Sequence, residues 1–290
     1  MESAGPTVAA GEVRLIYGDA RELPGISAES VHLVVTSPPY PMISQWDAQF
    51  AHLGARGYEE MRGILATAWK ACYRVLVPGG ILAIVIGDAL RSEGGSFQLW
   101  PNHASSLIDG VTAGFRPLPY LIWKKPTNKP NAFLGSGFLP PNAYVTLDCE
   151  FILLFRKGGP RRLPRHDARR SNSRYDRAER DRWFSQLWTD VRGTRQERGN
   201  GRTGAFPEEI PRRLIRMFSL VGDTVLDPFA GTGTTLWVAA SLGRDAIGVE
   251  IDRERFETLQ AERKVRRSEP ITGSSSGISR GGSLPRPPRA

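Results

Sequence analysis

The chain has 290 residues, of which 40% are hydrophobic and 24% are charged, and its formal net charge is +9. This length allows a full hydrophobic core, either in one large α/β domain with an insertion or in two domains. The two cysteines, Cys72 and Cys149, lie far apart without paired-ligand spacing, which argues against a disulfide framework and a metal site. The sequence shows no long uncharged apolar run and no signal-peptide pattern, so we expect a cytoplasmic protein that does not enter a membrane.

The excess positive charge is concentrated in residues 156–202. This segment contains 15 lysines and arginines and 6 acidic residues, a balance of +9, so the rest of the chain is neutral. Arginine suits phosphates and guanine edges, and the segment therefore predicts a nucleic-acid contact. The alternative is a solvated, partly disordered basic loop. Four apolar residues interrupt the charge and could anchor a small subdomain or stack on bases: Trp183, Phe184, Leu187 and Trp188.

The first half of the chain predicts strands that alternate with helices. A strand at 13–17 ends at Asp19, whose carboxylate could accept hydrogen bonds from a ligand or cap a helix. Residues 31–35 are mostly apolar, β-branched and soon followed by proline, as in a buried parallel strand. Next we expect a loop at 41–57, whose aromatic side chains either line a pocket or pack against the protein. We expect helices at 58–76 and 104–113, and the Pro-Gly-Gly at 78–80 stops the first of them. Further strands are expected at 81–86, 118–123 and 150–155.

A stiff turn, Ser37-Pro38-Pro39-Tyr40, follows the strand at 31–35. Each proline fixes its own φ, restricts the residue before it to extended conformations and lacks an N–H donor. The turn therefore presents acceptors, the Ser37 hydroxyl and the Pro38 carbonyl, beside the aromatic ring of Tyr40. Such a cluster at the carboxyl end of a parallel strand suits a planar ring that bears an amine. The alternative is a turn that ends a strand and packs a tyrosine.

The second half predicts a strand–turn–helix–strand unit. The glycine-rich turn Asp-Pro-Phe-Ala-Gly-Thr-Gly-Thr-Thr spans 227–235, and Glu250 ends the second strand. In a nucleoside-binding unit of this kind, glycines allow close backbone approach, the helix N-terminus holds an anionic group and the acid binds a ribose diol. The turn is not a P-loop, because no lysine follows the glycines, and Leu236 replaces the third glycine of G-x-G-x-x-G. Around this turn we expect helices at 212–220, 235–242 and 253–266 and strands at 225–226 and 246–250.

Together the two motifs resemble those of the S-adenosylmethionine-dependent DNA amino-methyltransferases. That family carries a catalytic [Asp/Asn/Ser]-Pro-Pro-[Tyr/Phe] and a cofactor-binding Phe-x-Gly-x-Gly, and the similarity spans roughly residues 13–265. The catalytic turn precedes the glycine turn with the basic segment between them, which resembles the permuted β type of the family. The resemblance implies an α/β fold, a Rossmann-like doubly wound methyltransferase sheet in circularly permuted order. It divides the chain into a catalytic half (11–155), a basic target-recognition region (156–205), a cofactor-binding half (206–266) and a tail (267–290) whose composition predicts disorder.

The resemblance also implies a role for each motif residue. Residues 37–40 would hold the target base, with Tyr40 stacking on it. Glu250 would bind the ribose hydroxyls of S-adenosylmethionine, and Asp19 would accept from its adenine amine. The remaining cofactor contacts would come from Thr36, Phe206, Pro207, Asp227, Phe229, Ala230, Gly231, Gly233, Thr234, Thr235 and Ile251.

The expected chemistry is methylation of an exocyclic amine. Serine at the first position of the catalytic turn is typical of members that methylate cytosine at its 4-amino group, whereas aspartate is typical of adenine methylators. If Ser37 and the Pro38 carbonyl accept the two amine hydrogens, the nitrogen lone pair would point at the sulfonium methyl for direct in-line transfer. The base would have to flip out of the duplex. Methylation of a cytosine ring carbon is not expected, because it needs a thiolate, usually in a Pro-Cys pair that this chain lacks.

We therefore expect a site-specific DNA cytosine-N(4) methyltransferase that acts on double-stranded DNA in a prokaryotic cytoplasm, in association with the nucleoid. A cognate restriction endonuclease could be its functional partner. The alternatives are an adenine-N(6) methyltransferase on the same scaffold, a non-catalytic DNA-binding protein that retains the fold, and an enzyme that acts on RNA or protein. The recognition sequence and the oligomeric state are not predicted.

Overall fold

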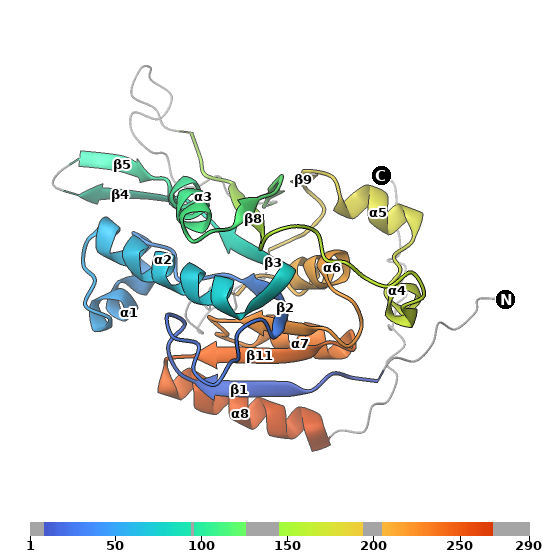
Figure 1. The fold of residues 1–290 in the computed structure, drawn as a ribbon. Coiled ribbons are helices and arrows are strands. Elements are labelled where there is room, and N and C mark those ends of the chain that lie inside the picture. Colours follow the sequence, from blue (N-terminus) through green and yellow to red (C-terminus); the bar gives the residue numbers. More distant parts are fainter. Residues whose placement is uncertain (1–8, 94–95, 126–144, 194–204, 269–290) are drawn as a thin grey trace, which may run out of the picture.

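The computed structural model of the chain describes residues 9–93, 96–125, 145–193 and 205–268. The tail was predicted to be disordered from 267, but residues 267 and 268 belong to the last helix. Residues 269–290 of the tail and residues 194–204 of the basic segment lie outside the described ranges. The described residues form a large mixed sheet with helices on both faces, and a separate two-stranded hairpin (Figure 1).

Five neighbouring strands of the sheet are parallel. Across the sheet the order is β1 (Val13–Tyr17), β11 (Asp245–Glu250), β10 (Thr224–Asp227), β2 (Val31–Thr36), β3 (Leu76–Ile86), β8 (Cys149–Arg156), β7 (Leu121–Lys124) and β9 (Leu187–Trp188), and β6 (Arg116–Pro117) pairs with β8. Strands β1 to β3 in this order run parallel, β8 is antiparallel to both of its neighbours, and β9 is parallel to β7. The Rossmann-like doubly wound α/β fold is thereby confirmed, with antiparallel strands on one side of the parallel set.

Helices cover both faces because the central strands are apolar on both sides. One face packs against α2 (Tyr58–Val75) and α3 (Asn102–Thr112), and the other packs against α6 (Glu209–Phe218) and α7 (Thr234–Ser241). Side chains of β2 and β3 contribute to both hydrophobic clusters, which explains their continuous runs of valine, isoleucine and leucine. The last helix, α8 (Arg253–Ser268), lies along β1 and β11 at the edge of the sheet (Figure 1).

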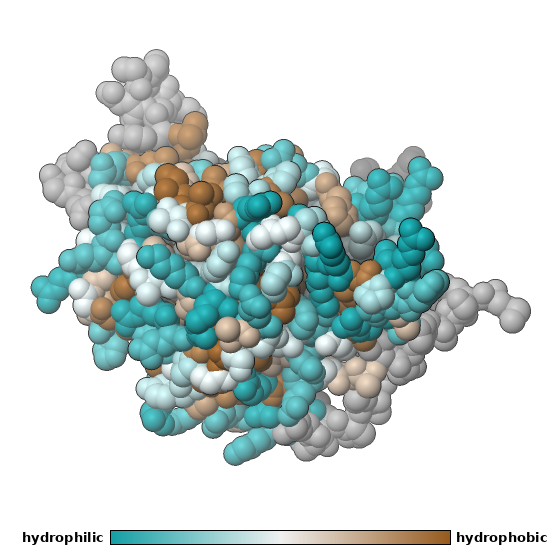
Figure 2. Space-filling model, in the orientation of Figure 1, coloured by the Kyte–Doolittle hydropathy of each residue, from teal (hydrophilic) through white to brown (hydrophobic). Residues whose placement is uncertain are grey.

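The smaller elements lie at the two ends of the strands. The short 3-10 helix η1 (Ser44–Trp46), α1 (Asp47–His52) and the hairpin β4 (Ala89–Glu93)–β5 (Ser96–Trp100) lie beyond the carboxyl ends of the parallel strands, whereas α4 (Ala168–Asn172) and α5 (Arg177–Trp183) lie at the opposite side (Figure 1). Hydrophilic atoms dominate the surface over α4 and α5, and hydrophobic atoms gather over α3, where Ile108 and Val111 are about half exposed (Figure 2). Among the described residues, no helix is both long and apolar enough to cross a bilayer.

Several predicted boundaries were wrong. Strand β3 begins at Leu76, although the sequence predicted a helix to this residue and a strand only from 81. The Pro-Gly-Gly at 78–80 therefore lies inside a strand, at a point where the β2–β3 register shifts and Gly79 adopts a φ of +83°. Such a bulge tolerates a proline, which has no N–H to give to the ladder. The predicted loop at 41–57 contains η1 and α1.

Other elements were shifted or not predicted. The strand expected at 118–123 is found at Leu121–Lys124, with β6 formed by the two residues before Leu118. Helix α6 begins at Glu209 rather than 212, because Pro211 is compatible with the first helical turn. The β4–β5 hairpin was not predicted, although two glycines separate its strands in the sequence and could have indicated it.

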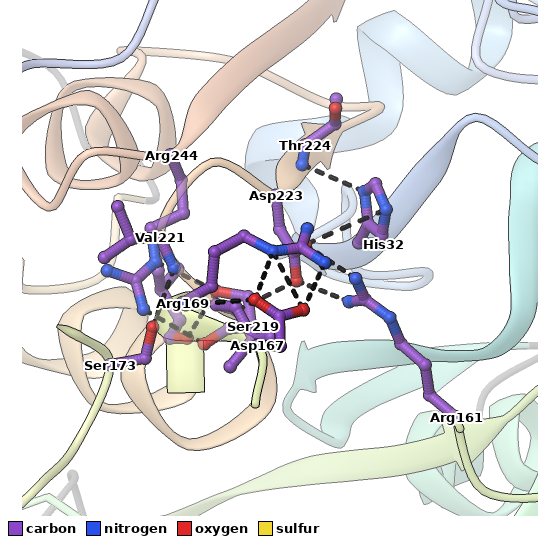
Figure 3. Close-up of polar contacts among 12 residues, drawn as sticks. His32, Arg161, Asp167, Arg169, Ser173, Ser219, Val221, Asp223, Thr224 and Arg244 are labelled. Carbon is purple, nitrogen blue, oxygen red and sulfur yellow. Dashed lines mark hydrogen bonds and ion pairs between the residues drawn. The ribbon is translucent and has the colours of Figure 1, made fainter. Parts of the chain in front are cut away.

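The basic segment crosses from one end of the strands to the other. It leaves β8 at their amino-terminal side, where Arg161 donates two hydrogen bonds of 2.5 and 2.9 Å to the buried carboxylate of Asp223 (Figure 3). Arg169 lies 3.7 Å from the same carboxylate. Burial opposes the charge of Asp223, but the Arg161 guanidinium and other donors outweigh burial and lower its pKa. After α5 the chain returns along β9, beside β7.

The apolar residues within the basic segment serve two roles. Trp183 and Trp188 are buried and anchor the segment, as one of the two alternatives held. Phe184 and Leu187 are 47% and 49% exposed, so they are available for contacts with a partner. Over the described range 156–193, the segment therefore contains α4, α5 and β9 and is anchored to the rest of the chain by two buried tryptophans.

Candidate active site

A pocket opens where four neighbouring parallel strands end. It contains about 860 Å³ of space, part of which is open to solvent. Its wall is formed by Gly18 and Asp19 after β1, Ser37 after β2, residues 227–232 after β10, and Glu250 with Ile251 at the end of β11. Parallel strands place their carboxyl ends at one edge of a sheet, and this is where open α/β sheets bind ligands.

The pocket brings together most of the residues that the sequence singled out. Those in its wall are Asp19, Ser37, Pro39, Phe206, Asp227, Phe229, Ala230, Gly231, Thr234, Glu250 and Ile251. Thr36, Gly233 and Thr235 are buried directly behind this wall. Pro38 is buried, and Tyr40 and Pro207 are partly buried, but none of the three lines the pocket. The catalytic turn and the glycine turn, which lie far apart in the sequence, thus face the same space.

Asp227 links the ends of β2 and β10. Its carboxylate Oδ1 accepts a 2.7 Å hydrogen bond from the Thr36 hydroxyl and a 3.1 Å bond from the backbone N–H of Phe229. Because burial disfavours the charged form and outweighs these donors, the pKa of Asp227 is raised to about 6. Asp227 therefore fixes the catalytic turn relative to the glycine turn.

The two glycines of the turn have different tasks. Gly231 and Gly233 adopt φ values of +52° and +75°, which favour glycine. A Cβ at Gly233 would lie 2.7 Å from atoms of both Leu259 and Trp237, whereas at Gly231 it would meet nothing closer than 3.8 Å. Gly233 thus allows α7 to pack against α8, and Gly231 provides a backbone conformation at the pocket wall.

Glu250 is held beneath the same turn. Its carboxylate accepts 2.9 Å hydrogen bonds from the backbone N–H groups of Gly231 and Asp252. Burial raises its pKa despite these donors. With Asp227, the pocket therefore holds two buried acids, each of which would be stabilised as an anion by a positively charged ligand.

The catalytic turn is fixed from below by β3, α3 and β8. The buried side chain of Asn102 donates hydrogen bonds of 3.0 Å to the carbonyls of Pro41 and Gly87. The Ser37 hydroxyl lies 3.1 Å from that of Tyr40, and the Tyr40 hydroxyl lies 3.0 Å from a carboxylate oxygen of Glu150. The sequence did not single out Asn102 or Glu150, because their proximity to the turn depends on how β3 pairs with β8.

The sequence also missed several residues of the wall, namely Arg21, Gln49, Leu53, Ile64, Ala205 and Arg255. Arg21 holds the Asp19 carboxylate through its backbone N–H and its guanidinium, at 2.6 to 2.9 Å. The Trp46 ring, left open between lining and packing, lines the pocket and lies 5.6 Å from the Arg255 guanidinium. Two signals in the sequence indicate these residues. Arg21 follows Asp19 in an Asp-x-Arg spacing after a strand, and Trp46 is an aromatic residue that follows Pro-Pro-Tyr.

The cysteines have no part in this site. Neither Cys72 nor Cys149 lines the pocket. Burial raises the pKa of both thiols, most strongly for the fully buried Cys72, so neither is activated as a thiolate. In the described part of the chain, no three His, Cys, Asp or Glu side chains are arranged to hold a metal ion.

The fold is that of a class I-like methyltransferase. The model of the N6/N4 methyltransferase family, described as DNA methylase, matches residues 31–262, and the chain belongs to this family.

Similar proteins include two Type II methyltransferases and one protein of known crystal structure. The chain is 53% identical to the Type II methyltransferase M.MjaI of Methanocaldococcus jannaschii, over 83% of this chain and 87% of the relative. It is 44% identical to the Type II methyltransferase M.MthZI of Methanothermobacter thermautotrophicus, over 86% of this chain and 75% of the relative. A protein of Thermus thermophilus assigned as a DNA modification methylase, crystallised with S-adenosyl-L-methionine, is 39% identical with a TM-score of 0.70, over 88% of this chain and 95% of that chain.

Proposed function

We propose that this chain methylates the exocyclic 4-amino group of cytosine in duplex DNA. Its family and its similarity to Type II methyltransferases support a site-specific DNA methyltransferase, and the related structure with bound cofactor supports S-adenosylmethionine as the methyl donor. The observation that carries the choice of cytosine is Ser37 in the pocket wall. It is a neutral hydroxyl at the position where adenine methylators typically carry aspartate.

The charge of the pocket suits S-adenosylmethionine. Its two buried acids, Asp227 and Glu250, suit a ligand that bears a sulfonium and an ammonium group. The ribose would be held by Glu250 and the adenine amine by Asp19, whose carboxylate Arg21 already orients. The open N-terminus of α7 at Thr234 suits the methionine carboxylate. When bound, the cofactor supplies an electrophilic methyl group.

The residues of the catalytic turn would act on the flipped base. The Ser37 hydroxyl and the Pro38 carbonyl accept the two amine hydrogens, so the nitrogen lone pair is freed from the ring and directed at the methyl group. Pro39, in the pocket wall, keeps the turn stiff, and Tyr40, which is partly buried at the end of the turn, would stack on the base. The reaction is a direct transfer, consistent with two cysteines whose pKa values are raised.

The remaining assignments belong to the same proposal. The catalytic turn precedes the glycine turn in the sequence and both line one pocket, which supports the permuted β arrangement and the division into 11–155, 156–205 and 206–266. Of the basic region, the part that returns along β9 to the carboxyl ends of the strands would recognise the target in duplex DNA. The Type II relatives support a cognate restriction endonuclease as functional partner. A DNA substrate in a prokaryote implies a cytoplasmic, nucleoid-associated enzyme.

The test is to identify the methylated nucleoside. Purified protein is incubated with duplex DNA and S-adenosylmethionine, the DNA is digested, and the nucleosides are analysed by mass spectrometry. We expect N(4)-methylcytosine, and about a hundredfold slower product formation by Ser37→Ala. Exclusive N(6)-methyladenine would overturn the choice of base and favour the adenine alternative. Failure to bind S-adenosylhomocysteine in calorimetry would instead favour a non-catalytic DNA-binding protein.

A further inference from the structure

We infer that Tyr40 and Glu150 form a relay that orients the Ser37 hydroxyl as a hydrogen-bond acceptor toward the target amine. The inference rests on the proposed function, because it assumes that Ser37 meets an amine. It goes beyond that function by assigning positioning roles to a tyrosine hydroxyl and to an acid that lies outside both sequence motifs.

The direction of the relay follows from its acidic end. An ionised carboxylate can only accept hydrogen bonds, so the 3.0 Å contact between Tyr40 and Glu150 requires Tyr40 to donate its proton. The Tyr40 oxygen then has only lone pairs to offer at its 3.1 Å contact with Ser37, so Ser37 donates to it. The opposite direction would leave two oxygens, those of Tyr40 and Glu150, facing each other without a proton.

Two features hold the acidic end of the relay in place. Lys125 forms an ion pair with the other carboxylate oxygen of Glu150. Gly87 lies beneath the pair, since a Cβ there would lie 3.2 Å from both Glu150 Cγ and Tyr40 Cε2. Burial and the nearby charge of Glu150 raise the pKa of Tyr40 well above its ordinary value, so the tyrosine keeps the proton that it donates.

The orientation of Ser37 matters for the chemistry. Because the Ser37 O–H donates a hydrogen bond to Tyr40, the Ser37 oxygen offers its lone pairs to an N–H of the amine. A serine that donated instead would bond the nitrogen lone pair, which is the electron pair that must attack the methyl group. Through the relay, the Glu150 carboxylate, two hydrogen bonds away, therefore determines that the neutral Ser37 hydroxyl acts as an acceptor toward the amine.

The test uses two substitutions that keep shape. Tyr40→Phe retains the ring for stacking and removes the hydroxyl, whereas Glu150→Gln retains the shape and lets an amide N–H face Tyr40. We expect each variant to lower the single-turnover methylation rate about tenfold, the size of one hydrogen bond. We expect S-adenosylhomocysteine affinity in calorimetry and the midpoint of thermal unfolding to stay close to wild type. Tyr58→Phe, which removes a hydroxyl bonded to Ser105 outside the pocket wall, is the matched control.

The double variant separates a relay from two independent effects. If Tyr40 and Glu150 act through Ser37 in series, Tyr40→Phe with Glu150→Gln should be no slower than the slower single variant. Multiplied losses in the double variant, single-variant rates within twofold of wild type, or cofactor affinity that falls in parallel with the rate would each overturn the relay. The product of the wild-type enzyme tests the proposed function separately, since a relay of this kind could also serve an adenine amine.

Discussion

At the scale of single residues, the proposed choice of cytosine and the proposed transfer step both rest on Ser37. It lines the pocket from the β2 side, and its hydroxyl bonds to Tyr40 and not to the glycine turn. We expect Ser37→Ala to lower the single-turnover rate by about a hundredfold, as for loss of one positioned polar group. Calorimetry should show affinity for S-adenosylhomocysteine within about twofold of wild type. A parallel loss of cofactor affinity would refute this division of roles.

Asp227 predicts a pH dependence of stability. Its pKa is raised from 3.8 to about 6 by burial, so the folded protein holds this proton more tightly than the unfolded chain. The resulting stabilisation is complete below pH 3.8 and is lost as pH rises through about 6. The loss is roughly 3 kcal/mol when titration is complete, by the conversion of pKa shifts into free energy.

The variant that isolates this effect is Asp227→Asn, which keeps an acceptor for Thr36 and for the Phe229 N–H. Urea titrations without cofactor would give the free energy of unfolding of both proteins from about pH 4 to pH 8. The difference should move in favour of the variant by up to about 3 kcal/mol as pH rises. A difference that does not change with pH would show that Asp227 does not titrate in this range.

At the scale of elements, the glycine turn needs its two glycines for different reasons, one for backbone conformation and the other for close packing. Both glycines have positive φ, but a side chain at Gly233 would collide with Leu259 and Trp237, whereas at Gly231 it would project into open space. We expect Gly231→Ala to cost about 1 kcal/mol through strain and Gly233→Ala to cost about 2 to 4 kcal/mol. Gly63→Ala, on an exposed face of α2, should instead stabilise by up to about 1 kcal/mol. Thermal and urea unfolding of the three variants would decide the order.

The strand ends could be predicted because their signals are local. Short apolar runs ending in Asp19, Ser37, Asp227 and Glu250 indicate parallel strands whose carboxyl ends share one edge, and the structure places all four in one pocket. Glu150 could not be predicted in this way. It reaches the catalytic turn because β8 pairs antiparallel with β3, with Phe151 opposite Ile86, and a single sequence does not contain that register.

Long-range ion pairs and β-bulges could not be predicted from the sequence either. Proline and two glycines at 78–80 normally end a helix, but here the partner strand accommodates them within β3. Arg161 was counted as free positive charge, yet the structure pairs it with Asp223, which lies outside the basic segment. Net charge along a sequence therefore overestimates the charge that a segment presents to a partner.

At the scale of the whole molecule, the candidate active site and an arginine-lined cleft lie at opposite ends of the strands. The pocket opens at the carboxyl ends of the strands, whereas a cleft lined by Arg156, Arg170 and Arg174 opens at their amino ends. The two openings are therefore separated by about the length of a strand, which for the six residues of β2 is roughly 20 Å. If the flipped base enters the pocket, the duplex lies against the carboxyl side, near Lys124 at the end of β7.

This arrangement separates two groups of variants. We expect Lys124→Ala to weaken binding to specific duplex DNA and to reduce the slope of log affinity against log salt by about 1, the contribution of one phosphate contact. Arg170→Ala with Arg174→Ala should change neither quantity measurably, although it removes twice the charge. Fluorescence anisotropy over a series of salt concentrations, with S-adenosylhomocysteine present, would measure both. If the slope of log affinity against log salt falls in the double arginine variant and not in Lys124→Ala, the duplex contacts the amino-terminal side, and the α4–α5 region takes part in binding DNA.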